Sequence, residues 1–488
     1  MDTPHDEGRN AVRRLNGVDA LLLYSEAPEI HMNTLKIGIL DVSALDDEFT
    51  FELFRRVAEP RLLALSPLRY QLVDIPFKLH HPMWIENAEL DFDYHLRSIT
   101  LPAPGGRREL DQLIGELAST PLDRSRPLWE MYVVDGLAGG RIAVIHKVHH
   151  VLADGVASAN QMGWAIQPDA PDLPSTKIRT GDAERTMAGL IKAAGRDHGR
   201  QLRRLPKLVA DTGRGVARVR RRGKERGKHP ELASNFSPPE SFINHVVSPV
   251  RRFATAPLSL ADVKETAKAL GVTLNDIVLA TAAGALRELS LRYDGAAESP
   301  LIAGVPVSYG SPARLVGNEF TYLTPSLPIH KADPLERVRL TAISTQIAKE
   351  NNKLLGPSLL PAWMNYLPPS LAPRAFRWQS KRMESSAVMN LTVSNVPGPR
   401  TRGSFSGATI TEIYSVGPLV VGSGMNITVW SYVDQLSISV LTDDLTTDDP
   451  HEVTDAMLRS FIDIRRAAGC SEELTEVDAV LPLAGAKR

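Results

Sequence analysis

Apolar positions in the first third of the chain follow two periods, one typical of strands and one of helices. The run Leu35 to Val42 alternates as a strand does, and residues 49–62 place their apolar side chains at helical spacing. Residues 126–150 predict two strands joined by a Gly-containing turn. This pattern predicts a first domain of the α/β (α+β) class over residues 1–170.

The last part of the chain repeats this mixture of helices and strands. Residues 257–271 predict a helix that Ser259 caps and Gly271 ends, and residues 273–289 predict a second helix. Four strand-like runs follow, over residues 301–308, 388–396, 424–432 and 435–442. We therefore expect a second α/β domain over residues 247–488, which makes the chain a pseudo-duplicated pair of similar halves.

The connecting residues 171–246 differ from both halves in composition. Residues 192–228 contain fourteen Lys and Arg against three Asp and Glu, a net charge of +11 in a chain whose total is −1. Four apolar residues of this stretch fall on one helical face: Leu202, Leu205, Leu208 and Val209. Since Pro206 interrupts that face, we expect a connector with amphipathic helical pieces. Its charge attracts phosphates of a membrane, a nucleotide or nucleic acid, although a solvated linker has the same composition.

Length and composition exclude several classes of protein. A chain of 488 residues is long for one core, so two domains of roughly 150 to 250 residues are expected. No apolar run reaches the roughly 18 residues that a membrane span needs, and the charged first residues lack the apolar core of a signal peptide. We therefore expect a cytoplasmic protein without a transmembrane segment. The single cysteine, Cys470, excludes an internal disulfide and a Cys-rich zinc site.

The segment HKVHHVLADG, residues 146–155, places three histidines, an aspartate and a glycine directly after a strand-like run. A metal pair of His146 and His150 has the required spacing, but zinc needs three or four convergent ligands and the sequence offers no evident third one. A hydrolase triad and a phosphate-binding loop are disfavoured, because the chain contains neither G-x-S-x-G nor a Walker A sequence.

A general base is the remaining interpretation. His150 has an ordinary pKa of about 6.5, so it can take a proton from an alcohol at neutral pH, for a rate gain of roughly a hundred- to ten-thousandfold. Asp154 is expected to fix the bend that follows or to hold an arginine, and Gly155 to supply a backbone conformation closed to other residues. Adjacent strand residues face opposite sides, so His149 and His150 are not expected in one pocket.

The doubled motif HHVLADG, residues 149–155, resembles the signature of the chloramphenicol acetyltransferase-like acyltransferases, and among them that of the bacterial wax ester synthase/diacylglycerol acyltransferase family. Further blocks of that family follow in order over nearly the whole chain: RPLWE (126–130), LNDIVLA (274–280), PVS (306–308), GN (317–318), SNVPGP (394–399) and GSGMNITVWSY (422–432). The chain departs from the family at Gly310, where an arginine is usual that could hold a phosphate or an internal carboxylate.

This resemblance implies both a fold and a reaction. The fold would be two chloramphenicol acetyltransferase-like domains, each a mixed sheet flanked by helices, joined by a helical linker. The reaction would be transfer of a long-chain acyl group from acyl-CoA, the co-substrate, to diacylglycerol or to a long-chain alcohol. No cofactor and no metal are implied, and direct transfer without an acyl-enzyme is expected.

The resemblance also suggests roles for individual residues. His150 would be the general base, Asp154 would orient the motif, His149 would support it and Gly155 would form its turn. An oxyanion needs hydrogen-bond donors aimed at it. The matched blocks offer three candidates, each of which could equally be a helix cap or a strand-end hydrogen bond: Asn275, Ser394 and Asn395.

Partners and alternatives complete these expectations. The basic connector would lie at a membrane or lipid-droplet surface, or would attract the phosphates of CoA. Nucleic acid is not an expected partner, because the segment lacks interleaved aromatic residues. Two alternatives stay open: a condensation-type enzyme that takes its acyl group from a carrier protein, and a non-catalytic lipid-binding relative, which only the departure at Gly310 supports.

Overall fold

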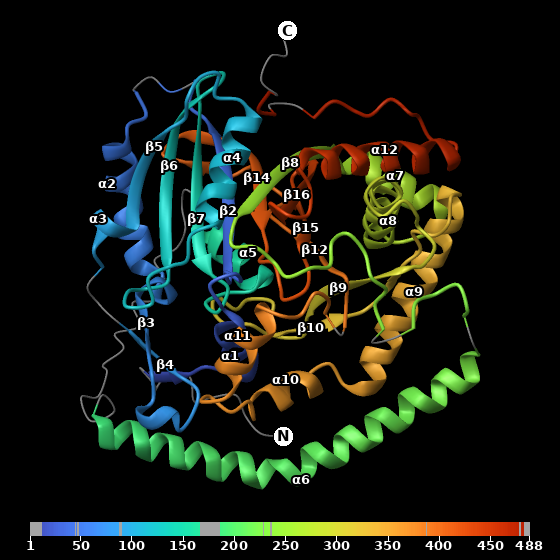
Figure 1. Cartoon of the computed structure of the whole chain (residues 1–488). Coiled ribbons are helices and arrows are strands. Elements are labelled where there is room, and N and C mark those ends of the chain that lie inside the picture. Colours follow the sequence, from blue (N-terminus) through green and yellow to red (C-terminus); the bar gives the residue numbers. More distant parts are fainter. Residues whose placement is uncertain are drawn as a thin grey trace.

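The computed structural model describes residues 12–43, 45, 48–86, 90–165, 186–227, 229–234, 237–386, 388–477 and 480–482. Two large sheets lie side by side with helices around them, and one long helix runs along the edge of the molecule (Figure 1). Both sheets are mixed, because each contains at least one parallel pair of strands among antiparallel ones. The predicted class, with two mixed sheets flanked by helices, is confirmed.

The first sheet has six strands, and its centre is formed by the predicted strand at Leu35 and by the second strand of the predicted hairpin. In spatial order its strands are β13 (Ser404–Phe405), β14 (Ala408–Val416), β2 (Asn33–Asp41), β7 (Arg141–His149), β6 (Trp129–Leu137) and β5 (Leu96–Thr100). β2 and β7 are antiparallel, with Asn33 opposite His149 and Lys36 opposite His146. This register places the predicted histidines beside the residues of β2.

The second sheet contains all four strand-like runs predicted from the last part of the chain. Its main path is β10 (Phe320–Leu323), β9 (Leu301–Ser308), β12 (Leu391–Pro397), β15 (Met425–Tyr432), β16 (Gln435–Asp443) and β8 (Arg251–Ser259), and β11 (Ser326–Leu327) pairs with β9. A third, small sheet is formed by β1 (Val12–Arg14), β4 (Met83–Glu86) and β3 (Tyr70–Val73).

The two sheets are interlocked, because β13 and β14 of the last part of the chain belong to the first sheet. β14 pairs with β2 and also lies against β15 and β16 of the second sheet. The predicted division of the chain into residues 1–170, 171–246 and 247–488 stays a prediction. Its first boundary falls in residues 166–185, outside the described residues.

Helices cover the sheets, and α2, α7 and α8 lie within a few residues of the three helices that the sequence predicts. The helices of the first part are α1 (Gly17–Ser25), α2 (Phe51–Ala64), α3 (Phe92–His95), α4 (Arg107–Ala118) and α5 (Gly155–Ala165), with short 3₁₀ turns η1 (Ser66–Arg69) and η2 (Pro76–Lys78). Those after it are α6 (Met187–Arg226), α7 (Leu260–Leu270), α8 (Leu274–Tyr293), α9 (Pro334–Leu355), α10 (Leu359–Met364), α11 (Ala372–Ser380) and α12 (His451–Ala467). Ser259 caps α7, and Gly271 ends it with a left-handed φ of 65°.

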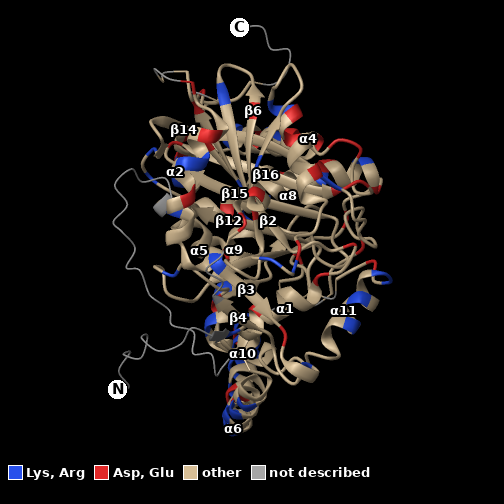
Figure 2. Ribbon diagram, turned by 90° about the vertical axis from the view of Figure 1, so that its left-hand side faces the viewer, with Lys and Arg blue, Asp and Glu red and all other residues tan. Residues whose placement is uncertain are grey.

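The basic connector forms a single helix, α6, rather than separate pieces. Pro206 lies inside this helix of 40 residues and does not end it; a bend near the middle of α6 is visible in Figure 1, consistent with the hydrogen bond that proline removes. The apolar face is also divided: Leu202 and Val209 are 69% and 53% exposed, whereas Leu205 and Leu208 are half-buried against the protein. Lys and Arg residues are frequent along α6, which lies at the lower edge of Figure 2.

Within the described residues, no single helix has the length and apolar character to cross a membrane. α7 and α8 meet that description only when they are taken together, and the pair is bent by 98°.

Candidate active site

His150 follows the last residue of β7, at the point where the chain leaves the first sheet. Its backbone N–H donates to the carbonyl of Met32 at 2.7 Å, and the N–H of Leu152 donates to the carbonyl of His149 at 3.0 Å. The second bond closes a tight turn. Because neighbouring strand residues face opposite sides, His149 is buried on one side of the sheet and His150 faces a cavity on the other.

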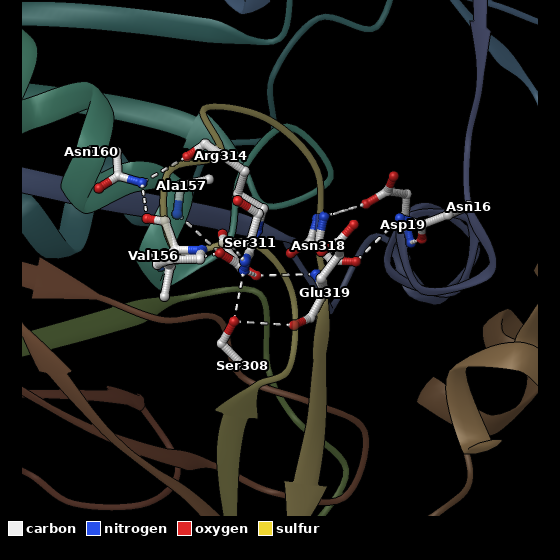
Figure 3. A network of polar contacts seen from close by, with 12 residues as sticks. Asn16, Asp19, Val156, Ala157, Asn160, Ser308, Ser311, Arg314, Asn318 and Glu319 are labelled. Atoms are coloured by element: carbon white, nitrogen blue, oxygen red, sulfur yellow. Dashed lines mark hydrogen bonds and ion pairs between the residues drawn. The ribbon is translucent and has the colours of Figure 1, made fainter. Parts of the chain in front are cut away.

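The imidazole of His150 is oriented by Asn318. Its Nδ1 atom lies 3.0 Å from Oδ1 of Asn318, whose Nδ2 donates to Asp19 at 2.9 Å and to the carbonyl of His150 at 2.8 Å. Figure 3 shows the contact of Asn318 with Asp19. Since the amide oxygen can only accept, Nδ1 carries the proton and Nε2 keeps a free lone pair. The ring therefore has the tautomer that a base needs.

Burial lowers the pKa of His150 to about 4, and the positive charge of Lys36 acts in the same direction. Lys36 lies in β2 and donates from Nζ to the hydroxyl of Ser415 at 2.5 Å. Burial lowers the pKa of Lys36 to about 8, so most of its charge persists at pH 7. His150 is consequently neutral at pH 7 and can accept a proton.

Asp154 ties the start of α5 to a loop of the second half of the chain. Its Oδ1 accepts from the backbone N–H groups of Val156 and Ala157 at 3.1 Å each, which caps α5. Its Oδ2 accepts from the N–H of Glu319 at 3.1 Å and forms an ion pair with Arg314. Both charged side chains of the pair are buried, with exposed fractions of 5% and 8%.

Near the departure at Gly310, Arg314 supplies a cation that holds an internal carboxylate. A Cβ atom at Gly310 would overlap the carboxylate of Glu319, so a side chain there would collide with its neighbour. Arg314, four residues later, provides the cation that holds Asp154, and it also donates to the hydroxyl of Ser308 at 3.1 Å. An internal carboxylate is therefore held by an arginine in spite of the departure.

The prediction that Gly155 adopts a backbone conformation closed to other residues is wrong. Gly155 is the first residue of α5, and its φ does not lie in the left-handed region. A Cβ atom there would lie 3.0 Å from Cγ2 of Val396 in β12. A side chain at this position would press on Val396, because α5 approaches the second sheet closely.

One cavity of about 440 Å³ brings the two halves of the chain together. Six of the seven predicted site residues line it: His150, Asp154, Gly155, Asn275, Ser394 and Asn395. Asn275 lies in the first turn of α8, and Ser394 and Asn395 lie in β12. Within the described residues the side chains of these last three make no hydrogen bond, so their polar groups are available to a ligand in the cavity.

His149 is the predicted residue that the cavity does not include. Its ring is fully buried, and Nε2 lies 3.5 Å from Oε1 of Glu26 while Nδ1 accepts from the N–H of Val151 at 3.1 Å. Burial alone would raise the pKa of Glu26, but the neighbouring side chains of His149 and Arg124 lower it to about 2. His149 therefore supports the turn from behind rather than from the cavity.

An apolar pocket lies beside the cavity of His150, and Lys36 lines both. His146 lines this second pocket, so it does not converge with His150 as a metal pair would. Within the described part of the chain no group of three or more His, Cys, Asp or Glu is placed to hold a metal ion. The other walls come mainly from β2, α2 and β14 and include Leu40, Phe54, Leu62, Leu65, Phe405 and Ile413.

Four residues of the site were missed by sequence reasoning. Asn318 stands in a matched Gly-Asn block, but nothing in the sequence places it beside a histidine 168 positions away. Arg314 and Asp19 have no sequence signal of their own. Lys36 could have been found, because a lysine inside the apolar strand Leu35 to Val42 is unusual and must have a reason to be buried.

Two mixed sheets that meet at a His-x-x-x-Asp-Gly turn, with a neutral histidine in the shared cavity, define a protein of the chloramphenicol acetyltransferase-like acyltransferase class. Residues 15–278 match the wax ester synthase/diacylglycerol acyltransferase catalytic domain, and residues 316–465 match the WS/DGAT C-terminal domain. The chain belongs to this acyltransferase family, as the motifs predicted.

Relatives and solved structures agree with this assignment. A Mycobacterium tuberculosis protein with the provisional name of a diacylglycerol O-acyltransferase is 54% identical over 96% of this chain and 99% of its own length. The O-acyltransferase WSD of Acinetobacter baylyi is 33% identical over 75% of this chain and 79% of its own. The structure of wax ester synthase/diacylglycerol acyltransferase from Marinobacter aquaeolei VT8 superimposes with a TM-score of 0.63 at 25% identity, covering 94% of this chain and 100% of its own.

The same fold occurs in a peptide-synthetase condensation domain. The first condensation domain of the calcium-dependent antibiotic synthetase matches with a TM-score of 0.58 at 17% identity, over 96% of this chain and 98% of its own.

Proposed function

We propose that the protein moves a long-chain acyl group from acyl-CoA to the hydroxyl of diacylglycerol or of a long-chain alcohol, with His150 as general base. The observation that carries this proposal is the neutral His150, whose Nδ1 is held by Asn318 and whose Nε2 is free, in a cavity lined by both halves of the chain. Family membership supports the reaction, and the geometry supports the role of the residue.

The chemistry requires one proton to move twice. Nε2 of His150 removes the proton of the acceptor hydroxyl while the oxygen attacks the thioester carbonyl carbon. The tetrahedral intermediate collapses, the carbon–sulfur bond breaks, and the CoA thiolate takes the proton back from the imidazolium. Such base catalysis contributes about a hundred- to ten-thousandfold in rate. An acyl-enzyme is not needed, because the histidine serves both half-steps.

Negative charge on the carbonyl oxygen needs donors on the cavity wall. Asn275, Ser394 and Asn395 each present a side-chain donor there and have no hydrogen-bond partner among the described residues. We assign the oxyanion to this group, since each lost donor of this kind costs roughly a hundred- to a thousandfold. Asp154 acts on the reaction indirectly, by holding the turn after His150 in place.

The apolar pocket beside Lys36 is the proposed place for an alkyl chain. It opens along the same face of β2 and β7 as the catalytic cavity, and Gly38 leaves space in its wall. Burying a methylene group is worth about 0.8 kcal/mol, so a pocket of this kind favours long chains over short ones.

We further propose that the enzyme is cytoplasmic and that α6 rests on a membrane or lipid-droplet surface. Leu202 and Val209 are exposed on α6, with Arg203, Arg204 and Lys207 around them. Apolar side chains beside cations suit an anionic lipid surface.

Flotation with phosphatidylglycerol vesicles tests this role, because vesicle-bound protein rises with the vesicles. The double substitution Leu202→Ser with Val209→Ser should weaken vesicle binding more than Leu291→Ser, which changes an exposed leucine of α8. Equal flotation of all three proteins would contradict this role.

The experiment that tests the reaction is release of CoA thiol from palmitoyl-CoA. Purified protein is supplied with dioleoylglycerol, with hexadecanol or with no acceptor, and the ester is identified by mass spectrometry. Acceptor-dependent release that falls by a factor of about a hundred or more in His150→Ala would establish the role of the base. Full activity in the variant would refute it, and release only from an acyl carrier protein would favour the condensation-type alternative.

A further inference from the structure

A second polar cavity, of about 430 Å³, lies between α8, α9 and α12, on the helices that cover the second sheet. Along α8, Gly284 in its wall is nine residues from Asn275 of the catalytic cavity, which corresponds to roughly 14 Å at 1.5 Å per residue. None of the residues that line it lines the catalytic cavity. Its chemistry is therefore separate from acyl transfer.

Arg337 of α9 forms the floor of this cavity and is 4% exposed. It donates from Nη1 to the carbonyls of Lys331 and Ala332, at 3.0 and 2.7 Å, and its Nε has no hydrogen-bond partner. Arg287 of α8 lies beside it and donates to the carbonyl of Ile329 at 2.9 Å. Across the residues that the structure describes, neither arginine forms an ion pair.

Arg337 is buried and Arg287 is half-buried, and two neighbouring like charges without an ion pair are costly to a folded protein. Burial and the charge of Arg287 lower the pKa of Arg337 more than the negative charges of Asp463 and Asp333 raise it, yet a guanidinium stays protonated. The two carboxylates in the wall are already engaged: Glu288 pairs with Arg459 at 2.7 Å, and Asp463 pairs with Arg466 at 2.8 Å. An anion in the cavity would therefore offset the positive charge of the two arginines.

Ser460 of α12 adds a third donor. It is 5% exposed, lines the cavity, and its hydroxyl has no hydrogen-bond partner. Gly284 keeps the space in front of it open, because a Cβ atom there would overlap the Ser460 hydroxyl and lie 3.1 Å from Nη2 of Arg337. A buried hydroxyl without a partner is rare in folded proteins.

From this arrangement we propose that the cavity between α8, α9 and α12 binds a phosphate-type oxyanion through Arg337, Arg287 and Ser460. Guanidinium groups match phosphate oxygens two at a time, and the serine hydroxyl donates to a third oxygen. The ligand is inorganic phosphate or a phosphate monoester, which present the same oxygens to the site. Its binding requires no acyltransferase activity.

Calorimetric titration of the full-length protein with inorganic phosphate, in chloride buffer of matched ionic strength, tests this site. Arg287→Gln should weaken phosphate binding about tenfold or more, as expected for a lost charged hydrogen bond. Ser460→Ala should weaken it less, while leaving the melting temperature in chloride unchanged because its hydroxyl has no protein partner. The matched control is Arg292→Gln, an exposed arginine of the same helix, which should bind phosphate as the unaltered protein does.

Adenosine 3′,5′-bisphosphate, which carries phosphate monoesters, is titrated in a second arm and distinguishes the two sources of the ligand. Tighter binding of the nucleotide would assign the site to a phosphate monoester, and tighter binding of phosphate would assign it to the free ion. No binding of either compound at millimolar concentration would overturn the proposal. An equal loss in Arg287→Gln and Arg292→Gln would overturn it as well, since it would mark non-specific attraction.

Discussion

Two neighbouring cavities on one face of the first sheet contain a histidine each, and they differ in what surrounds it. His150 lies in the catalytic cavity and His146 in the apolar pocket, both on β7 or at its end, and Lys36 lines both spaces. Burial lowers the pKa of each histidine to about 4, with Lys36 contributing in the same direction. The two imidazoles are therefore equally neutral at pH 7.

The two histidines differ in their hydrogen bonds. Nδ1 of His150 meets Asn318, so its tautomer is defined, whereas Nε2 of His146 is buried without a hydrogen-bond partner in the described residues. Polar groups from β12 and α8 converge only on the cavity of His150. A lowered pKa thus does not distinguish the two histidines. The hydrogen-bond partner of Nδ1 and the polar groups of the cavity distinguish His150 from His146.

The largest expected effect concerns the ion pair of Asp154 and Arg314, which holds the turn after His150. Asp154→Ala leaves the buried Arg314 without its carboxylate and removes the cap of α5, so we expect the free energy of unfolding to fall by about 3–5 kcal/mol. Urea unfolding measures it. Arg314→Met in the same protein should restore part of the loss, because no unpaired charge remains. A change below about 1 kcal/mol in Asp154→Ala would disprove the role of the pair.

A smaller effect is expected from the partner of His150. Asn318→Leu removes the acceptor at Nδ1, so the ring loses its tautomer and its orientation, and kcat should fall roughly ten- to a hundredfold with little change in KM. Steady-state kinetics with palmitoyl-CoA measures this fall. In a His150→Ala background the same substitution should cost nothing further. An equal fall in both backgrounds would show that Asn318 acts elsewhere.

The apolar pocket is tested by filling it. Gly38→Leu projects a side chain into open space in its wall, so kcat/KM for a sixteen-carbon chain should fall about tenfold relative to that for an eight-carbon chain. Competition between the two acyl-CoA lengths, and then between the two alcohol lengths, identifies which substrate uses the pocket. The eight-carbon substrate is the internal control. An unchanged ratio for both substrates would remove the pocket from the reaction.

The smallest expected effect concerns Lys36, which lines both cavities. Its positive charge disfavours the protonated imidazolium, so Lys36→Met should raise the pKa of His150 from about 4 toward its ordinary value. Activity that needs the neutral base should then be lost at a higher pH as the solution is acidified. The acidic limb of kcat/KM against pH measures this shift. Lys349→Met, which removes another cation of the cavity wall, should leave the limb in place.

Local features of the fold could be predicted, because their causes are local. Ser259 and Gly271 bound α7, and the four strand-like runs of the last part form β9, β12, β15 and β16. Three other features could not be predicted, because they depend on contacts between residues that are far apart in the chain. β14 joins the first sheet although it follows β12 in the chain, α6 continues through Pro206, and Gly155 meets Val396 rather than adopting a special φ.

The sequence by itself determined the motif His150 to Gly155, the strand that presents it, and the family of acyltransferases to which the chain belongs. These follow from short-range periodicity and from an ordered set of blocks. Only the tertiary structure decided that Asn318 fixes the ring of His150, that Arg314 pairs with Asp154, and that the two cavities meet at Lys36. Such contacts join residues more than a hundred positions apart or on different strands. No local pattern encodes them, because they exist only when the sheets have assembled.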